Sequence, residues 1–138
     1  PEEPRIELLF PTEPAVTLAA GEYLVLARDV DLVRSRYDVP AEVTVLAWGA
    51  GRLGDDGAKI QLSRPAGQEE DGTPLWMRVD RVVDSDGSQA QEFAGAADPW
   101  PVEADGVGQA LSRIDPQAYG NDPENWHAAN PSPGRTND

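Results

Sequence analysis

The sequence contains no cysteine, and this absence excludes several classes of functional site. Thiol catalysis, disulfide bonds and structural zinc held by thiolates all require that residue. His127 is the single histidine, so a zinc site built from two imidazole ligands is excluded as well. A chain without cysteine can fold in any redox compartment, and cysteine usage therefore leaves the location open.

Long apolar runs and positive charge are also scarce. No run approaches the roughly 20 apolar residues that span a bilayer, which predicts no membrane insertion. Lys and Arg number 11 against 25 Asp and Glu, for a net charge of −14. A surface this acidic repels phosphate groups, so we expect no nucleic-acid partner and no docking on anionic membranes. The chain begins at Pro1 without a signal-peptide pattern, which indicates a piece of a longer or processed protein.

Glycine and proline, 13 of each, separate short apolar runs along the 138 residues. This punctuation predicts a single all-β domain over residues 1–134 and a disordered tail over 135–138. A bulge is expected near Arg81, where the apolar alternation changes phase. The polar stretch 65–74 is expected to be an exposed loop. The expected strands are 5–10, 22–28, 42–48, a short run around 60–62, 75–84 and 108–115.

One short helix is expected after the second strand. Asp29 is a typical N-cap residue, because its carboxylate can accept a free first-turn N–H group. Val30, Val33 and Tyr37 follow at helical spacing and form one apolar stripe. Pro40 prevents the helix from continuing.

Four motifs, in order, resemble the lamin tail domain of bacterial proteins. The first motif, "TLAAGEYLVLARDVDLVRSRYD", corresponds to a turn, a strand and a helix. The second, "GRLGDDGAKIQL", corresponds to a loop and a strand, and the third, "VDRVVD", to a further strand. The fourth is the terminal block from Asp98 to Gly134. Its matching positions are Trp100, Pro101, Asp105, Gly106, Gly108, Leu111, Arg113, Asn121, Asp122, Trp126 and Pro131–Gly134.

The resemblance implies an immunoglobulin-like β-sandwich, truncated at its N-terminus, because the two opening strands of the family pattern have no counterpart here. It also implies a non-catalytic adhesion or protein-interaction module of an exported bacterial protein, located outside the cell or on its surface. The expected partner is a protein or a cell surface. Missing strands would leave an unpaired sheet edge, through which the chain could form a dimer.

The acidic loop residues allow two interpretations. Calcium prefers carboxylate and carbonyl oxygens on flexible loops, which makes Asp55, Asp56, Asp105 and Asp122 candidate ligands. Asp also begins turns, because its side chain accepts nearby backbone N–H groups. No stretch follows the EF-hand spacing, so we predict turn formers and no bound cofactor, with calcium as the alternative.

Catalytic chemistry finds little support in the sequence. Ser112, His127 and Asp122 could form a triad, but the seryl context "ALSRI" indicates an ordinary strand and not the sharp turn of a nucleophile. We therefore expect no catalytic residues and no enzyme.

The four tryptophans suggest the runner-up function, a carbohydrate-binding accessory module of a secreted hydrolase. Trp76 and Trp100 lie near acids and could line a sugar groove. Core packing is the expected role of Trp48 and Trp126, because tryptophan usually has a large buried area. Trp100 and Trp126 are expected to be structural anchors, and Asp105 and Asp122 to accept backbone N–H groups. Two exposed, adjacent tryptophans would instead favour the carbohydrate-binding module.

Overall fold

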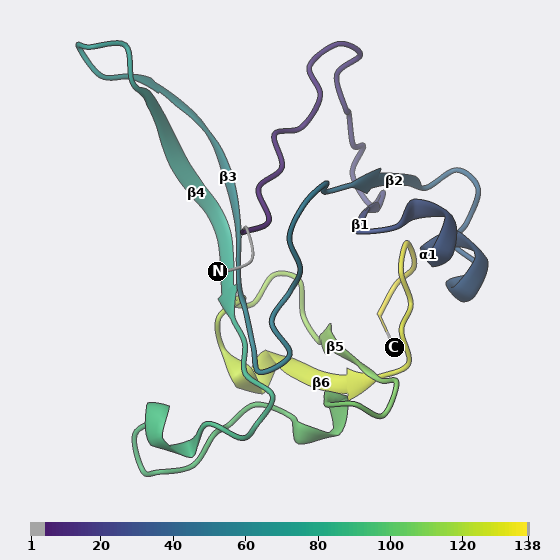
Figure 1. Cartoon of the computed structure of the whole chain (residues 1–138), viewed down its shortest axis with the longest axis vertical. Coiled ribbons are helices and arrows are strands. Elements are labelled where there is room, and N and C mark those ends of the chain that lie inside the picture. The colour runs from purple at the N-terminus through teal and green to yellow at the C-terminus, as the bar shows by residue number, and fades with distance from the viewer. Residues whose placement is uncertain (1–4, 138) are drawn as a thin grey trace. The chain divides into compact units, whose positions relative to one another are not determined.

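A computed structural model describes residues 5–137 of the chain. Strands in small sheets and one α-helix make up its regular structure (Figure 1), so the prediction of a β-rich fold with one short helix is confirmed. The chain divides into two compact units, one formed by residues up to Leu53 and from Asn130 onward, the other by Gly54–Ala129. No helix within residues 5–137 is long and apolar enough to cross a membrane.

The first unit contains two short strands joined by the helix. Strand β1 (Leu24–Ala27) pairs in parallel with β2 (Thr44–Ala47), and helix α1 (Val30–Tyr37) forms the crossover that a parallel pair requires. The two strands lie within the predicted runs 22–28 and 42–48. Their paired cores are shorter than those runs, although the Trp48 N–H also donates to the Ala27 carbonyl just beyond the paired residues.

Helix α1 forms as its sequence predicts. The Asp29 carboxylate accepts the Leu32 N–H at 2.9 Å, which satisfies one of the free donors of the first turn. The helix ends at Asp38, which adopts a left-handed conformation. The Arg34 guanidinium donates to the Val43 carbonyl at 2.7 Å, so α1 is tied to the segment that enters β2.

The end of the chain completes this unit. The turn at Gly134 lies against Val39 and Val43, both of which are buried. Gly134 has φ of +77°, and an added Cβ would lie only 3.0 Å from a Val43 methyl group. Arg135 donates to the Asp38 carbonyl at 2.8 Å, and the hydroxyl groups of Tyr23 and Thr136 are hydrogen-bonded at 3.0 Å.

The predicted strand over Arg5–Phe10 is wrong. The segment has no assigned strand, because no described residue pairs with its backbone. Its side chains still alternate in burial, with Ile6, Leu8 and Phe10 less exposed than the residues between them. An alternating burial pattern is therefore not enough to form a strand, because a strand also requires a backbone partner.

The second unit is organised around a long antiparallel hairpin of β3 (Lys59–Gln68) and β4 (Pro74–Val83). Both strands extend into the predicted loop 65–74, and only residues 69–73 remain as the tip. The register shifts between Leu62 and Ser63. The residue left without a partner is Val79 on β4, two residues before the predicted position at Arg81.

The unit closes with a shorter antiparallel pair, β5 (Ala110–Arg113) and β6 (Trp126–Ala129). Strand β5 lies within the predicted run 108–115, whereas β6 was not predicted. Three short 3-10 helices lie in the connections, η1 (Ala90–Glu92), η2 (Val102–Ala104) and η3 (Pro123–Asn125).

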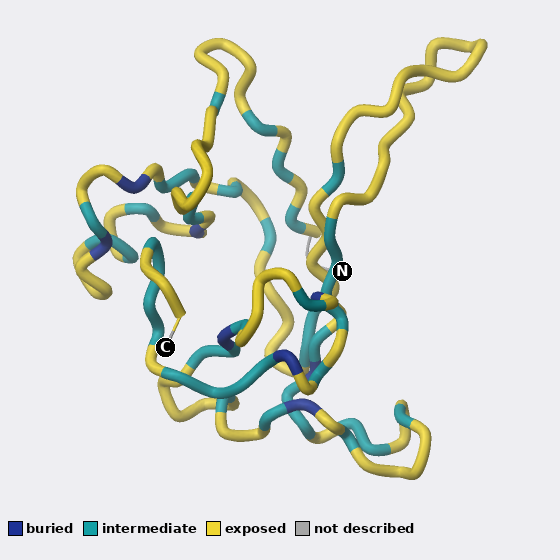
Figure 2. The backbone as a smooth tube through the Cα atoms, turned by 180° about the vertical axis from the view of Figure 1, so that it is seen from behind, coloured by how far each residue is buried: buried dark blue, intermediate teal, exposed yellow. Residues whose placement is uncertain are grey.

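Burial is sparse in both units (Figure 2). Trp100 is the buried hydrophobic residue of the second unit, where Ser85, Ser112 and Asn125 are also buried. Buried polar groups must find hydrogen-bond partners, so this unit depends on its polar network as well as on apolar contacts. Within that network the Arg113 guanidinium contacts the Asp80 carboxylate at 2.7 Å and connects β5 to β4.

Candidate functional site

The terminal part of the second unit is organised by Asp98. Its carboxylate accepts the Ser85 hydroxyl, the Gln89 N–H at 3.1 Å and the Trp100 N–H at 3.0 Å. Burial raises the pKa of Asp98, but these three hydrogen bonds outweigh it and hold the pKa below its usual range. An ionised Asp98 thereby fixes the loop that carries Trp100.

Trp100 and Trp126 contact each other. Trp100 is 3 % exposed and Trp126 is partly exposed, with ring centroids 6.2 Å apart and planes inclined at 46°. The Trp126 indole N–H donates to the Gly120 carbonyl at 2.8 Å. This tilted arrangement is favourable for an aromatic pair, and the indole hydrogen bond fixes the orientation of the Trp126 ring.

A buried asparagine supports the loop before Trp126. Asn125 donates to the Asp115 carbonyl and accepts the Asp115 N–H, both at 2.9 Å. The Asp122 carboxylate accepts the Glu124 N–H at 3.1 Å and caps η3. No described residue donates a hydrogen bond to the carboxylate of Asp105, the other predicted acceptor.

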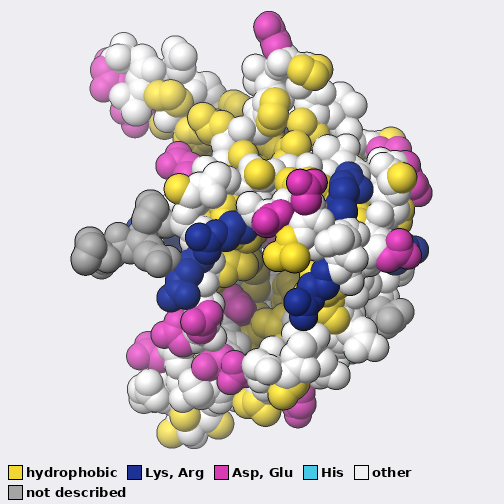
Figure 3. Space-filling view, turned by 45° about the vertical axis from the view of Figure 1, so that its right-hand side comes forward, with side chains coloured by type: hydrophobic (Ala, Val, Ile, Leu, Met, Phe, Trp, Pro, Cys, Tyr) yellow, Lys and Arg dark blue, Asp and Glu magenta, His cyan; other side chains and the backbone are white. Residues whose placement is uncertain are grey.

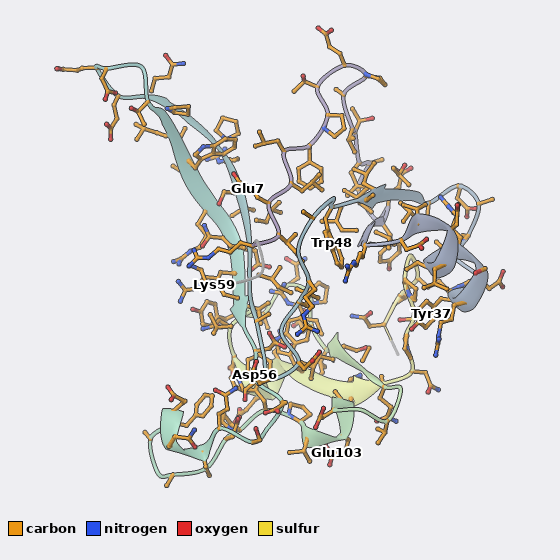
Figure 4. The ribbon with its side chains drawn as sticks, viewed as in Figure 1. Glu7, Tyr37, Trp48, Asp56, Lys59 and Glu103 are labelled. Carbon is orange, nitrogen blue, oxygen red and sulfur yellow. The ribbon has the colours of Figure 1, made fainter. Side chains whose placement is uncertain are left out.

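An open pocket of about 530 Å³ lies beside this aromatic pair. Trp126 lines it together with three prolines, Pro99, Pro101 and Pro123. Glu103 on η2 and Glu124 on η3 also line it, and η2 packs against β6. Figure 4 labels Glu103 on its short helix near β6. We refer to this site as the Trp126 pocket.

Two of the four calcium candidates meet elsewhere in this unit. Asp55 and Asp105 line a second pocket of about 470 Å³ together with Asp84 and Asp86, whereas Asp56 and Asp122 do not line it. The Asp84 and Asp86 carboxylates accept the N–H groups of Ala58 and Ser88, respectively. Within residues 5–137, no group of three or more carboxylate or imidazole side chains is arranged to hold a metal ion. The pocket therefore carries no argument for calcium.

The residues of the hypothetical triad are brought only partly together. Ser112 and His127 are cross-strand partners on β5 and β6, a proximity that sequence spacing did not predict. Ser112 is buried, and the buried Nε2 of His127 has no hydrogen-bond partner among the described residues. The Asp122 carboxylate contacts the Glu124 backbone. A linked serine, histidine and carboxylate are therefore not assembled in the part of the chain that the structure describes.

No protein-family model, curated protein or solved structure matches the chain. The functional argument therefore depends on the geometry of the chain itself.

Sequence reasoning missed the two glutamates of the Trp126 pocket. Glu103 and Glu124 lie 21 positions apart in sequence, and only the folding of η2 and η3 beside β6 brings both to one pocket. The only sequence signal is that each of them lies within a few residues of a proline and a tryptophan. Such a signal is too general to identify a site without the structure.

Proposed function

We propose that this chain is a non-catalytic protein-interaction module of an exported bacterial protein, with the immunoglobulin-like sandwich of a lamin tail domain, truncated at its N-terminus, as its fold. The observation that carries the interaction role is the exposed apolar face of the β3–β4 hairpin. The family and the location are supported only by the four sequence motifs.

The apolar face is defined by the register of the hairpin. Ile60 and Leu62 on β3 lie on the same face as Leu75 and Met77 on β4. These four side chains are 39–49 % exposed. Figure 2 shows the length of the hairpin as mostly exposed, and Figure 3 shows hydrophobic side chains on the molecular surface among acidic ones. A two-stranded hairpin is only marginally stable in water, and clustered exposed apolar residues typically mark a binding surface.

The hairpin also differs in charge from the rest of the chain. Lys59, Arg64, Arg78 and Arg81 lie on its strands, although the whole chain has a net charge of −14. Asp80, the acidic residue of these strands, is paired with Arg113. Of these basic residues only Arg64 shares the apolar face, so a partner surface that combines apolar side chains with a carboxylate would complement that face.

The carbohydrate-binding alternative receives less support. A sugar platform needs accessible aromatic faces, whereas Trp100 is buried and contacts the Trp126 ring. Trp76 is 53 % exposed, but it lies on the opposite face of the hairpin from Met77. The adjacent pair of exposed tryptophans that would favour a carbohydrate-binding module is not formed.

A site-specific photo-crosslinking experiment tests the interaction role. A photoreactive amino acid replaces Leu62 on the apolar face or, as a matched control, Gln61 on the opposite face of the same strand. The chain is then incubated with the surface proteins of the bacterium that encodes it. We expect a defined protein crosslink from position 62 and none from position 61.

Equal crosslinking from both positions, or none from either, would contradict the interaction role of this face. Binding to a glycan array that is lost in Trp76→Ala would favour the carbohydrate-binding module instead.

A further inference from the structure

We propose that the Trp126 pocket binds an organic cation, the ammonium or guanidinium end of a lysine or arginine side chain on a partner protein. The pocket is separate from the apolar hairpin face. The choice of a protein as the source of the cation rests on the proposed function, whereas the preference for a cation rests on the pocket itself.

The aromatic wall of the pocket is held in a fixed orientation. The Trp126 indole N–H is hydrogen-bonded to the Gly120 carbonyl, and the buried Trp100 ring lies on one side of it. Trp126 remains partly exposed and lines the pocket. A cation is attracted to the face of an indole ring, and a ring that is already fixed loses little freedom when the cation binds.

Two carboxylates provide the charge. Glu103 and Glu124 are both exposed, and no described residue forms a hydrogen bond or an ion pair with either side chain. Each projects from a short turn whose backbone is closed, η2 by the Asp105 N–H to the Val102 carbonyl and η3 by its Asp122 cap. The carboxylates are thus placed beside an aromatic wall and remain available to a ligand.

Part of the remaining lining suits the stem of a long side chain, and Gln109, His127 and Ala128 complete the lining. Pro99, Pro101 and Pro123 add rigid apolar surface, along which the methylene groups of lysine or arginine can pack. The pocket volume of about 530 Å³ is within the range of ligand sites, but the pocket is open to solvent. An open pocket is better suited to a side chain that enters from a partner surface than to an enclosed small molecule. The net charge of −14 also attracts a basic partner.

The test uses the full chain and acetylated, amidated peptides in which a single Lys or Arg is flanked by glycines. A peptide with Gln at the central position is the neutral control, and tetramethylammonium represents a free ammonium ligand. Binding is followed at low salt through the indole N–H resonance of Trp126. We expect a saturable shift with the Lys or Arg peptide and none with the Gln peptide.

Two variants with the same change in net charge distinguish binding at the pocket from attraction to the overall charge of the chain. Glu103→Gln/Glu124→Gln is expected to weaken binding about fivefold or more, because it removes two ion pairs. Glu69→Gln/Glu70→Gln removes the same charge at the hairpin tip and is expected to leave affinity within about twofold. An equal loss in both variants would overturn the proposal, since attraction would then be non-specific.

Three further outcomes would also overturn it. These are the absence of a saturable shift, a shift with tetramethylammonium but not with the peptides, and a shift with a neutral oligosaccharide that exceeds the shift with the peptides. The crosslinking experiment at Leu62 is independent of this pocket, so the interaction role and the cation site can fail separately.

Discussion

At the scale of single residues, Asp98 connects two loops of the second unit, a role that no sequence motif indicates. It joins the loop after β4 to the loop that carries Trp100, and its hydroxyl partner Ser85 is buried. Removing an acceptor from a buried donor exposes the full cost of desolvating that donor. The stability of this region therefore depends on one carboxylate.

We predict that Asp98→Ala lowers the free energy of unfolding by about 2 kcal/mol, because a charged acceptor of three hydrogen bonds is lost. Urea denaturation followed by tryptophan fluorescence measures this change. Asp105→Ala is the matched control, since its carboxylate is exposed and accepts no hydrogen bond from a described residue. We expect the control to change stability by less than about 0.5 kcal/mol. Similar losses in both variants would contradict the assigned role of Asp98.

The same residue has a pH dependence of known sign. The folded-state pKa of Asp98 is lowered, so its contribution to stability is present above the unfolded-state pKa and is lost as pH falls through the folded-state pKa. Lower pH also relieves repulsion among the many carboxylates, so the difference between wild type and Asp98→Asn is the informative quantity. This difference should shrink on acidification through the carboxylate range.

At the scale of elements, helix α1 shows what local sequence can predict. Its N-cap, its span and its end all depend on residues within one short stretch. The strands could not be predicted from local sequence alone, because β6 and the segment Arg5–Phe10 depend on whether a partner strand is present. The segment Arg5–Phe10 has apolar residues but no partner strand, whereas β6 has a partner but was not predicted, because pairing is decided by distant parts of the chain.

We predict that Asp29→Ala destabilises α1 and lowers the free energy of unfolding by about 1 kcal/mol, through loss of the bond to the Leu32 N–H. Asp31→Ala is the control, because it removes a first-turn charge but leaves the cap in place. Its expected cost is a few tenths of a kcal/mol, from the helix dipole alone. Chemical denaturation followed by circular dichroism compares the two variants, and an equal cost would show that the cap bond contributes little.

The candidate sites likewise include residues that local sequence predicts and pairs of residues that only the folded chain brings together. Trp100 and Trp126 could be selected as anchors from the sequence, because large aromatic residues between prolines and turns seldom lie free in solution. The Trp126 pocket could not be predicted, since Glu103 and Glu124 meet only after the chain folds. The Ser112–His127 proximity likewise depends on the register of β5 with β6.

At the scale of the whole molecule, stability depends on a small core under a large net charge. The buried hydrophobic residues among those described are Ala27, Val39, Val43 and Trp100. A net charge of −14 opposes any compact state through self-repulsion. With few apolar contacts to offset it, this repulsion should be measurable in the stability of the chain.

We predict that raising sodium chloride from about 0.05 M to about 1 M increases Tm by a few degrees, because salt screens repulsion among the acids. Glu69→Lys/Glu70→Lys provides a matched variant, with the net charge changed from −14 to −10 because each change replaces one negative charge by one positive charge. It should melt higher at low salt and respond less to added salt. A Tm that is indifferent to salt in both proteins would contradict the role of repulsion.

The tip of the hairpin has a practical consequence for engineering. Residues 69–73 are exposed, and they are closed on themselves by the Glu69 N–H to Thr73 carbonyl bond and the Gly72 N–H to Glu69 carbonyl bond. An inserted epitope or fluorophore-binding tag at Glu70–Asp71 would therefore interrupt no contact with another element. A reporter inserted there would report partner binding along the strands of the hairpin. It would leave the Trp126 pocket unoccupied.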